Sequence, residues 1–207
     1  MELMSESIKD GTRIDAAFAL AESADEGHVA LSGNRNPHLS WSGAPSETRS
    51  YVITCIDIDC PSVADDVNQE DREIPSDLPR VNFTHWLLAN IPADVTEIVE
   101  GAHSSAVTAR GKSANSADVG VHGLNDYTMW FDEDPDMGGL WHGYDGPAPP
   151  WNDSIIHSYV FTVYAIDVDE LEVAPGFDRD TLEATMHAHV LASASITGTY
   201  ATNPRLG

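Results

Sequence analysis

Two aspartates separated by one residue, Asp57 and Asp59, close a run of strand-forming residues and are followed by Pro61. Side chains two positions apart in a β-strand point to the same side, so both carboxylates are expected on one face at the strand's end. Proline cannot donate to a ladder, which places Pro61 where the pairing stops. The spacing is equally typical of turn-forming aspartates that cap a strand, and the motif alone leaves both interpretations open.

Two histidines could provide partners for these carboxylates. His85 lies inside an apolar run, in Thr84-His85-Trp86. A buried neutral imidazole needs a partner for its N–H group, and a carboxylate on a neighbouring strand would supply one. His157 opens a further run, after the loop GYDGPAPP at 143–150. Glycine permits close backbone approach and proline stiffens a loop, so a rigid wall with His157 at its mouth is predicted.

Strand-like runs must position these groups. Residues 50–59, 81–90 and 157–167 are rich in β-branched and apolar side chains, and we predict that they form central strands. The acidic segment 62–80 and the small, polar segment 101–120 are predicted to be solvated loops without chemistry.

The long connection at 121–156 is rich in Gly, Pro and Trp, and a loop of that size is typically functional or disordered; its aromatic content argues against disorder. A C-terminal helix is predicted from Asp180 and Glu183 at its start. The residues expected at helical spacing are Leu182, Met186, His189 and Val190. His187 and His189 are assigned to this helix and not to the site, because paired ligands on a helix prefer i, i+4 spacing.

Composition limits the function classes. A chain of 207 residues with alternating strand signals predicts one mainly β domain over 1–207. Ten basic and thirty-four acidic residues give a net charge of −24, which opposes nucleic acids and anionic membranes. The chain contains only two lysines, and this shortage resembles proteins from salt-rich cytoplasm; a simple acidic surface is the alternative.

Other patterns bear on location and redox state. No apolar run approaches the roughly 20 residues of a membrane-spanning helix, and the N-terminus lacks a signal-peptide pattern, so a cytoplasmic location is expected. Cys55 and Cys60 are too few for a disulfide framework and are predicted to be reduced thiols.

The motifs carry a resemblance in their order along the chain. DIDCP at 57–61, the pair His85-Trp86, YDGPAPP at 144–150 and the histidine of HSYVFTVYAID resemble signatures of the phosphatidylethanolamine-binding protein family, in its prokaryotic Raf-kinase-inhibitor-like branch. NRNPHLSWSGAP at 34–45 and the closing HAHVLASASITGTY are similar to other segments of that family. The resemblance spans roughly residues 34–204.

The resemblance implies antiparallel sheets in a Greek-key-like sandwich, a few peripheral helices and a small pocket for phosphate-like or carboxylate anions. Carried over by position, the implied ligand-binding residues are Asp57, Asp59, Pro61, His85, Tyr144, Gly146, Pro147 and His157. The chain departs from the family pattern at Cys60, at Ala148, at Ser158, which replaces an arginine, and in a slightly longer proline loop. The loss of that arginine puts any ion pair built on it in doubt.

Aspartates repel anions, so the predicted pocket needs other donors. We expect the carboxylates to accept hydrogen bonds from His85 or His157, to orient the rings and to raise their pKa, so that imidazole N–H groups donate to the ligand. Backbone N–H groups near Gly146 are expected to add an anion-binding concavity.

Three functional classes follow. The first, which we favour, is non-catalytic binding of a small anion or phosphorylated headgroup, without metal or other cofactor. The second is an interaction protein, such as a kinase inhibitor, with homodimer formation a further expectation from the resemblance. The third is a hydrolase in which two Asp and two His bind a metal that activates water, or act as acid and base.

The net charge generates a prediction about stability. A charge of −24 should make the fold repel itself in dilute buffer, and salt should screen that repulsion. The thermal unfolding midpoint should therefore rise between dilute buffer and molar sodium chloride, as followed by circular dichroism. A constant midpoint would contradict this.

Overall fold

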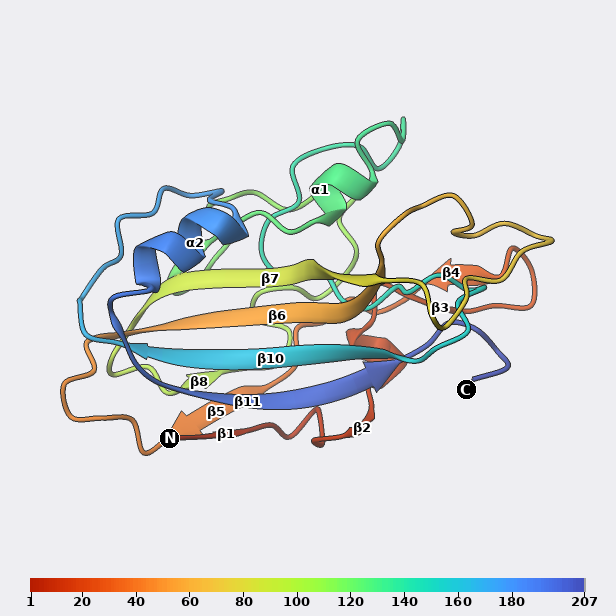
Figure 1. Cartoon of the computed structure of the whole chain (residues 1–207). Helices are drawn as coiled ribbons and strands as arrows, with labels where there is room; N and C mark the ends of the chain where they lie inside the picture. The colour runs from red at the N-terminus through yellow and green to blue at the C-terminus, as the bar shows by residue number, and fades with distance from the viewer. Residues whose placement is uncertain (207) are drawn as a thin grey trace.

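The computed structural model describes residues 1–206 and consists mainly of β-strands (Figure 1). The strands are β1 (Glu2–Met4), β2 (Thr12–Arg13), β3 (Ala21–Ser23), β4 (Val29–Leu31), β5 (Leu39–Ser42), β6 (Ser50–Pro61), β7 (Arg80–Pro92), β8 (Glu97–Ile98), β9 (Val121–His122), β10 (His157–Ile166) and β11 (Val190–Tyr200). The helices are α1 (Tyr127–Trp130) and α2 (Arg179–Met186), and a 3-10 turn spans Ala16–Phe18.

A six-stranded sheet in the order β2-β11-β10-β6-β7-β9 forms the centre of the fold. Its neighbouring strands are antiparallel except for the parallel pair β2 and β11. Strands β6, β7 and β9 lie next to one another in the sheet in that order, and β10, which follows them in the chain, returns to pair with the free side of β6, which is Greek-key connectivity. The predicted mainly β, antiparallel, Greek-key-like fold is confirmed.

The three predicted central strands are also confirmed, as β6, β7 and β10, which lie side by side in this sheet. They are rich in β-branched and aromatic residues, which pack well on a pleated surface. Each is buried over most of its length, with exposed residues concentrated towards the end of β6 and the start of β7.

The large sheet is covered on both faces. On one face the small sheet β1-β5-β8 packs against it, and Leu39 and Trp41 of the small sheet join a core with Ile53, Trp86 and Phe161. On the opposite face α2 and the segment before it form a second cluster, made of Val52, Leu87, Ala89, Ile166, Leu171, Phe177, Leu182 and Met186. Burial on both faces explains why the central strands are nearly continuous apolar runs.

The C-terminal helix exists but is shorter than predicted. Asp178, not Asp180, caps α2, because its side chain accepts a hydrogen bond from the Thr181 N–H. Leu182 and Met186 are buried as expected. The prediction was wrong for His189 and Val190, which lie beyond the helix end, and Val190 begins β11. The segment from Val190 to Tyr200 pairs with β10 instead of continuing the helix.

The loops that build the site gather at the end of the large sheet where β6 ends and β10 begins (Figure 1). The small β3-β4 hairpin lies there together with the loop at 62–79. The predicted connection at 121–156 is mostly irregular and contains only β9 and α1 as regular elements. Within residues 1–206, no helix is long and apolar enough to span a membrane.

Candidate functional site

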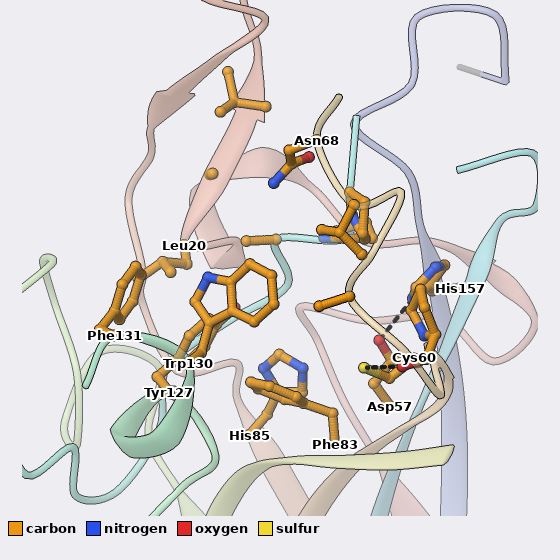
Figure 2. A pocket seen from close by; sticks show the side chains of 18 of the residues that line it. Leu20, Asp57, Cys60, Asn68, Phe83, His85, Tyr127, Trp130, Phe131 and His157 are labelled. Carbon is orange, nitrogen blue, oxygen red and sulfur yellow. Dashed lines mark hydrogen bonds and ion pairs between the residues drawn. The ribbon is translucent and has the colours of Figure 1, made fainter. Parts of the chain in front are cut away.

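A pocket of about 530 Å³ lies at this end of the sheet (Figure 2). Its volume falls in the range typical of small-molecule sites, roughly 300–1,000 Å³, and far exceeds what an inorganic phosphate occupies. The walls are mostly apolar and aromatic. The lining residues are Leu20, Ala21, Val29, Leu31, Asp57, Cys60, Pro61, Ser62, Val63, Ala64, Val67, Asn68, Phe83, His85, Tyr127, Trp130, Phe131, Met137, Ala148, Pro149, Pro150, His157 and Tyr159.

Cross-strand pairing brings the floor of the pocket together. Asp57 of β6 pairs in register with Tyr159 of β10 on one side and with Phe83 of β7 on the other. Side chains directly opposite one another on adjacent strands share a face, so the two aromatic rings flank the Asp57 carboxylate. Asp57 itself is 4% exposed.

A β-bulge directs His85 to the same floor. Along β6, Cys55 pairs with Trp86 and the next residue, Ile56, pairs with Thr84, so His85 is the extra residue on β7. A bulge breaks the two-residue alternation and re-aims a side chain. The imidazole of His85 consequently lies in the pocket beside Phe83 and Tyr159, with ring centroids 5.1 Å away in both cases.

His157 is held between two carboxylates. Its Nδ1–H donates to Asp57 Oδ2 over 2.7 Å and its Nε2–H donates to Asp153 Oδ2 over 3.0 Å, and the ring is buried. Ionised carboxylates only accept, so both ring nitrogens carry hydrogen and His157 is an imidazolium. Burial lowers the pKa of His157, but the hydrogen bonds to Asp153 and Asp57 outweigh it and raise the pKa to about 9.

Arg80 completes this charged chain. Its Nη1 and Nη2 donate to the two carboxylate oxygens of Asp153 over 2.6 and 3.0 Å, and Nη1 also donates to the Asp59 carbonyl. Burial raises the pKa of Asp153, but hydrogen bonds from His157 and Arg80 hold it below its ordinary value. The sequence Asp57, His157, Asp153, Arg80 alternates in charge and sums to zero.

His85 is bonded on one side only. Its Nδ1–H donates to the Asp145 carbonyl oxygen over 2.8 Å. Because Nδ1 carries the hydrogen of the neutral ring, Nε2 is an acceptor, and among residues 1–206 it has no hydrogen-bond partner. Burial lowers the pKa of His85 below its ordinary value of 6.5. The nearby Asp57 carboxylate raises this pKa, but by less than burial lowers it. Near neutral pH, the pocket is therefore lined by a neutral imidazole whose Nε2 lone pair is free.

A second buried network supports His85 from behind. The Asp145 carboxylate accepts from Asn34 and from the Lys112 ammonium, both over 2.7 Å, and from Asn125 over 2.9 Å. Burial raises the pKa of Asp145 while Lys112 opposes that rise. The Asp145 N–H also donates to the His85 carbonyl, so the backbone of the proline loop is fixed to β7.

The predicted site residues divide into two groups. Asp57, Pro61, His85 and His157 line the pocket. Asp59, Tyr144, Gly146 and Pro147 do not. Contacts of the proline loop hold the wall: the Tyr144 hydroxyl donates to the Phe18 carbonyl, and the Pro147 carbonyl accepts from Leu20 N–H.

The Gly146 N–H itself does not contribute to the expected anion-binding concavity. The Gly146 N–H donates to Asn34 Oδ1 over 2.8 Å, so it is not free to meet a ligand. The glycine is instead required by packing, because a Cβ there would collide with the Phe18 carbonyl oxygen.

The predicted shared face for Asp57 and Asp59 is also wrong. The pairing register is irregular between Asp57 and Cys60, which breaks the alternation on which the expectation depended. Asp59 lies outside the lining and its Oδ2 accepts from the Ser158 N–H over 2.7 Å. The hydrogen bond expected between a carboxylate and one of the two histidines joins Asp57 to His157, whereas His85 bonds a backbone carbonyl.

Several lining or supporting residues escaped the sequence reasoning. The loop at 62–80, predicted to have no chemistry, contributes Val63, Val67 and Asn68 to the pocket and ends at Arg80. The segment at 101–120 contributes Lys112 to the Asp145 network. The tyrosine two positions after His157, Tyr159, was a signal that could have been used, because strand alternation places it on the same face.

Two further observations concern the donors at the site. The Tyr159 hydroxyl is buried and, among residues 1–206, has no hydrogen-bond partner. Within the same residues, no group of three or more His, Cys, Asp or Glu side chains is arranged to hold a metal ion. Cys55 and Cys60 are free thiols.

The close packing at Gly146 predicts the effect of a single methyl group. Gly146→Ala should destabilise the fold by about 3 kcal/mol or more, because the wall must shift away from the Phe18 carbonyl. Gly27→Ala is the matched control: Gly27 has φ +74° but open space around its Cβ, so only backbone strain of about 1 kcal/mol is expected. Urea unfolding of both variants measures the difference, and equal losses would show that Gly146 is not closely packed.

The raised pKa of His157 predicts a loss of stability in mild alkali. Because the folded pKa of about 9 lies above the ordinary value of 6.5, the stabilisation is fully present below pH 6.5 and is lost as pH rises through about 9. The lost free energy of unfolding should be about 3 kcal/mol. His157→Gln should remove this dependence, whereas His187→Gln, on an exposed residue, should retain it. Chemical unfolding between pH 6 and 10 tests this, and identical profiles for wild type and His157→Gln would disprove it.

Comparisons with known proteins match this fold and these motifs. A sequence profile described as phosphatidylethanolamine-binding protein matches residues 4–201. UPF0098 protein YbhB of Escherichia coli is 28% identical over 201 residues, which cover 97% of this chain and 99% of that protein. A UPF0098 protein of Methanothermobacter thermautotrophicus is 32% identical over 167 residues, covering 81% of this chain and 83% of that protein.

A solved structure indicates the same family. The crystal structure of Escherichia coli YbcL, described as a new member of the mammalian PEBP family, superposes with a TM-score of 0.69 at 25% identity and covers 97% of both chains. The profile match extends the resemblance found in the motifs to almost the whole chain. The chain belongs to the phosphatidylethanolamine-binding protein family.

Proposed function

We propose that the pocket binds, without converting it, a small molecule that carries an anionic or phosphorylated group on an apolar body. The observation that supports this proposal most is that apolar walls surround a floor with few polar groups. The pocket is about 530 Å³ in volume and mostly apolar, and its floor contains one imidazole, His85, with an uncommitted ring nitrogen. A pocket of this kind, with few polar groups among apolar walls, is typical of a small-molecule site.

His85 is the residue that would bind the anion. Its Nδ1–H is committed to the Asp145 carbonyl, so a proton added to the ring goes to Nε2 and creates a donor that faces the pocket. The Asp57 carboxylate on the adjacent strand stabilises the resulting imidazolium. The unpartnered Tyr159 hydroxyl beside it is a second, uncharged donor.

The polar groups of the pocket support binding over catalysis. His157 has both N–H groups committed to carboxylates and cannot exchange a proton with a ligand without breaking one of these bonds. Burial, with Asp57 nearby, raises the pKa of the Cys60 thiol to about 12, so it is protonated and a weak nucleophile. Within residues 1–206, neither Cys60 nor Ser62 is hydrogen-bonded to a histidine. A panel of phosphate and carboxylate esters should show no turnover above that of buffer.

Protonation of His85 predicts how anion binding depends on pH. Diethyl phosphate keeps a single charge over the relevant range, so only the protein titrates. Because the anion prefers the protonated ring, its binding raises the pKa of His85 and takes up a proton. Affinity should be strongest below the free-state pKa, which lies below 6.5. It should fall by up to about tenfold per pH unit between the free-state and the ligand-bound pKa, and level off above the ligand-bound pKa. Calorimetric titration between pH 4.5 and 8.5, in two buffers of different ionisation enthalpy, measures affinity and counts protons.

The variant His85→Asn tests whether His85, and not another titratable group, causes the pH dependence of diethyl phosphate binding. The asparagine Nδ2–H can replace the bond to the Asp145 carbonyl, but the side chain cannot be protonated, so both the pH dependence and the proton uptake should vanish. His187→Gln is the control and should titrate like wild type. Diethyl phosphate affinity that is flat with pH in wild type would refute the anion assignment.

A further inference from the structure

A hydrogen bond between two buried histidines closes the long loop that precedes β9. His103 lies just before this loop, which we define as residues 104–120, and His122 lies in β9 just after it. His103 Nδ1 and His122 Nε2 are 2.9 Å apart. His103 is 4% exposed and His122 is fully buried. Neither residue lines the pocket, so this bridge does not depend on what the pocket binds.

The backbone on both sides of the bridge is fixed to the body of the protein. The side-chain oxygen of Asn36 accepts hydrogen bonds from the N–H groups of His103 and Ser104. His122 pairs in register with Leu88 of β7. Because both ends of the loop are held in this way, the two rings join across its base, as in other compact loops whose ends lie close together.

The loop folds back over its own base. Ser116 Oγ lies 3.2 Å from His122 Nδ1. Ala117 and Val119 pack against the core cluster that contains Trp86. Since the ring of His122 is fully buried under these contacts, water reaches it only after the loop moves away.

The geometry of the bridge allows one hydrogen between the two rings. A neutral imidazole has one N–H donor and one acceptor nitrogen, so one ring donates and the other accepts. When both rings are protonated, every ring nitrogen carries hydrogen, and two N–H groups would point at each other over 2.9 Å. The hydrogen bond is then replaced by repulsion between two buried cations.

The surroundings favour the uncharged bridge. Burial lowers the pKa of His103, although the Asp118 carboxylate of the loop opposes this change. Burial, together with basic neighbours, lowers the pKa of His122 to about 3. Those neighbours are His103, Lys112 and His142. Both rings are therefore neutral near pH 7 in the closed loop.

The loop also carries the cation that is bonded to Asp145. Lys112 Nζ donates to Asp145 Oδ1 over 2.7 Å, and the Asp145 side chain is fully buried. Opening of the loop withdraws this ammonium and leaves a buried carboxylate without its cation, which is costly. Movement of the loop is therefore coupled to the proline loop, to which Asp145 belongs.

We propose that the bridge between His103 and His122 is an acid-sensitive lock on loop 104–120. The neutral rings hold the loop closed over β9, and protonation of the rings opens the loop and withdraws Lys112 from Asp145.

Linkage gives the direction of the pH dependence. The rings are neutral in the closed loop and take up protons once they are exposed, because their folded pKa values lie below the ordinary value of 6.5. The stabilisation of the closed loop is therefore fully present above pH 6.5 and is lost as pH falls towards the folded pKa values.

Hydrogen exchange followed by mass spectrometry measures the opening at pH 7.5 and 5.5. Division by the intrinsic exchange rate at each pH gives the equilibrium constant for opening. For peptides of loop 104–120 this constant should rise at least about tenfold between the two pH values from His122 alone, and up to about a hundredfold if His103 also titrates. Peptides of β10 report unfolding of the whole sheet and should keep their protection.

The peptide 143–150 reports the coupling to Asp145. Its Asp145 and Gly146 N–H groups are bonded to the His85 carbonyl and to Asn34. This peptide should lose protection together with loop 104–120 as the pH falls.

Two substitutions keep the bridge but remove the titratable rings. In His122→Gln the terminal amide can lie where Nε2 lies in wild type, and in His103→Asn the amide can lie where Nδ1 lies. The double variant can form an amide–amide hydrogen bond at the base of the loop, so its opening constant should change less than about twofold between pH 7.5 and 5.5. His187→Gln, at an exposed histidine, is the control and should behave as wild type does.

The single variant His122→Gln keeps the test decisive if the double variant does not fold. It removes one titrating ring and retains His103, so its rise in opening should be about tenfold smaller than that of wild type. An equal rise in His122→Gln and wild type would show that His122 is not part of the lock.

The other outcomes are equally distinct. An opening constant that stays level in wild type, or that rises as much in the double variant, would overturn the lock, because the rings would then not respond to acid. Equal loss of protection in β10 would also overturn it, since that pattern indicates unfolding of the whole sheet. Full protection of 143–150 while the loop opens would overturn the withdrawal of Lys112 from Asp145.

Discussion

The arrangement of the site depends on one buried imidazolium held between two carboxylates. His157 joins the end of β6 to the start of β10 through Asp57, and its other bond reaches Asp153, which Arg80 holds from the start of β7. Loss of one partner from such a buried chain leaves an uncompensated charge, which costs far more than the intact chain contributes. The four residues therefore keep three strand ends in register, and the floor of the pocket lies on those ends.

Each of the two site histidines is oriented by a different kind of partner, and this determines its role. Carboxylates bind both nitrogens of His157, so the ring is charged and unavailable to a ligand. A backbone carbonyl binds one nitrogen of His85, so the ring stays neutral and retains a lone pair towards the pocket. The Asp145 network behind it, with Asn34, Asn125 and Lys112, fixes that carbonyl in place. One histidine stabilises the fold, and the other can respond to a ligand.

Sequence patterns predicted the framework well because the framework depends on short-range regularities. The apolar, β-branched runs became β6, β7 and β10, since each such run must be buried in a sheet. The ordered motifs indicated the family, which the profile match then confirmed. The C-terminal helix was placed too far along the chain because Val190 pairs with Ile166 in the sheet, and tertiary pairing there overrides the helical spacing.

The sequence by itself determined the strand-forming segments, the family, the acidic charge and the pairing of Asp57 with a histidine. Tertiary structure alone decided which histidine that would be, because Asp57 lies 100 residues from His157 in the chain and the Asp145 carbonyl lies 60 residues from His85. It also decided that His85 enters the pocket and Asp59 leaves it, since irregular pairing between β6 and β7 breaks the two-residue alternation that a sequence reading must assume. Residues of the loop at 62–79 and aromatic residues of α1 line the same pocket because the loops fold over one end of the sheet, which no local pattern encodes.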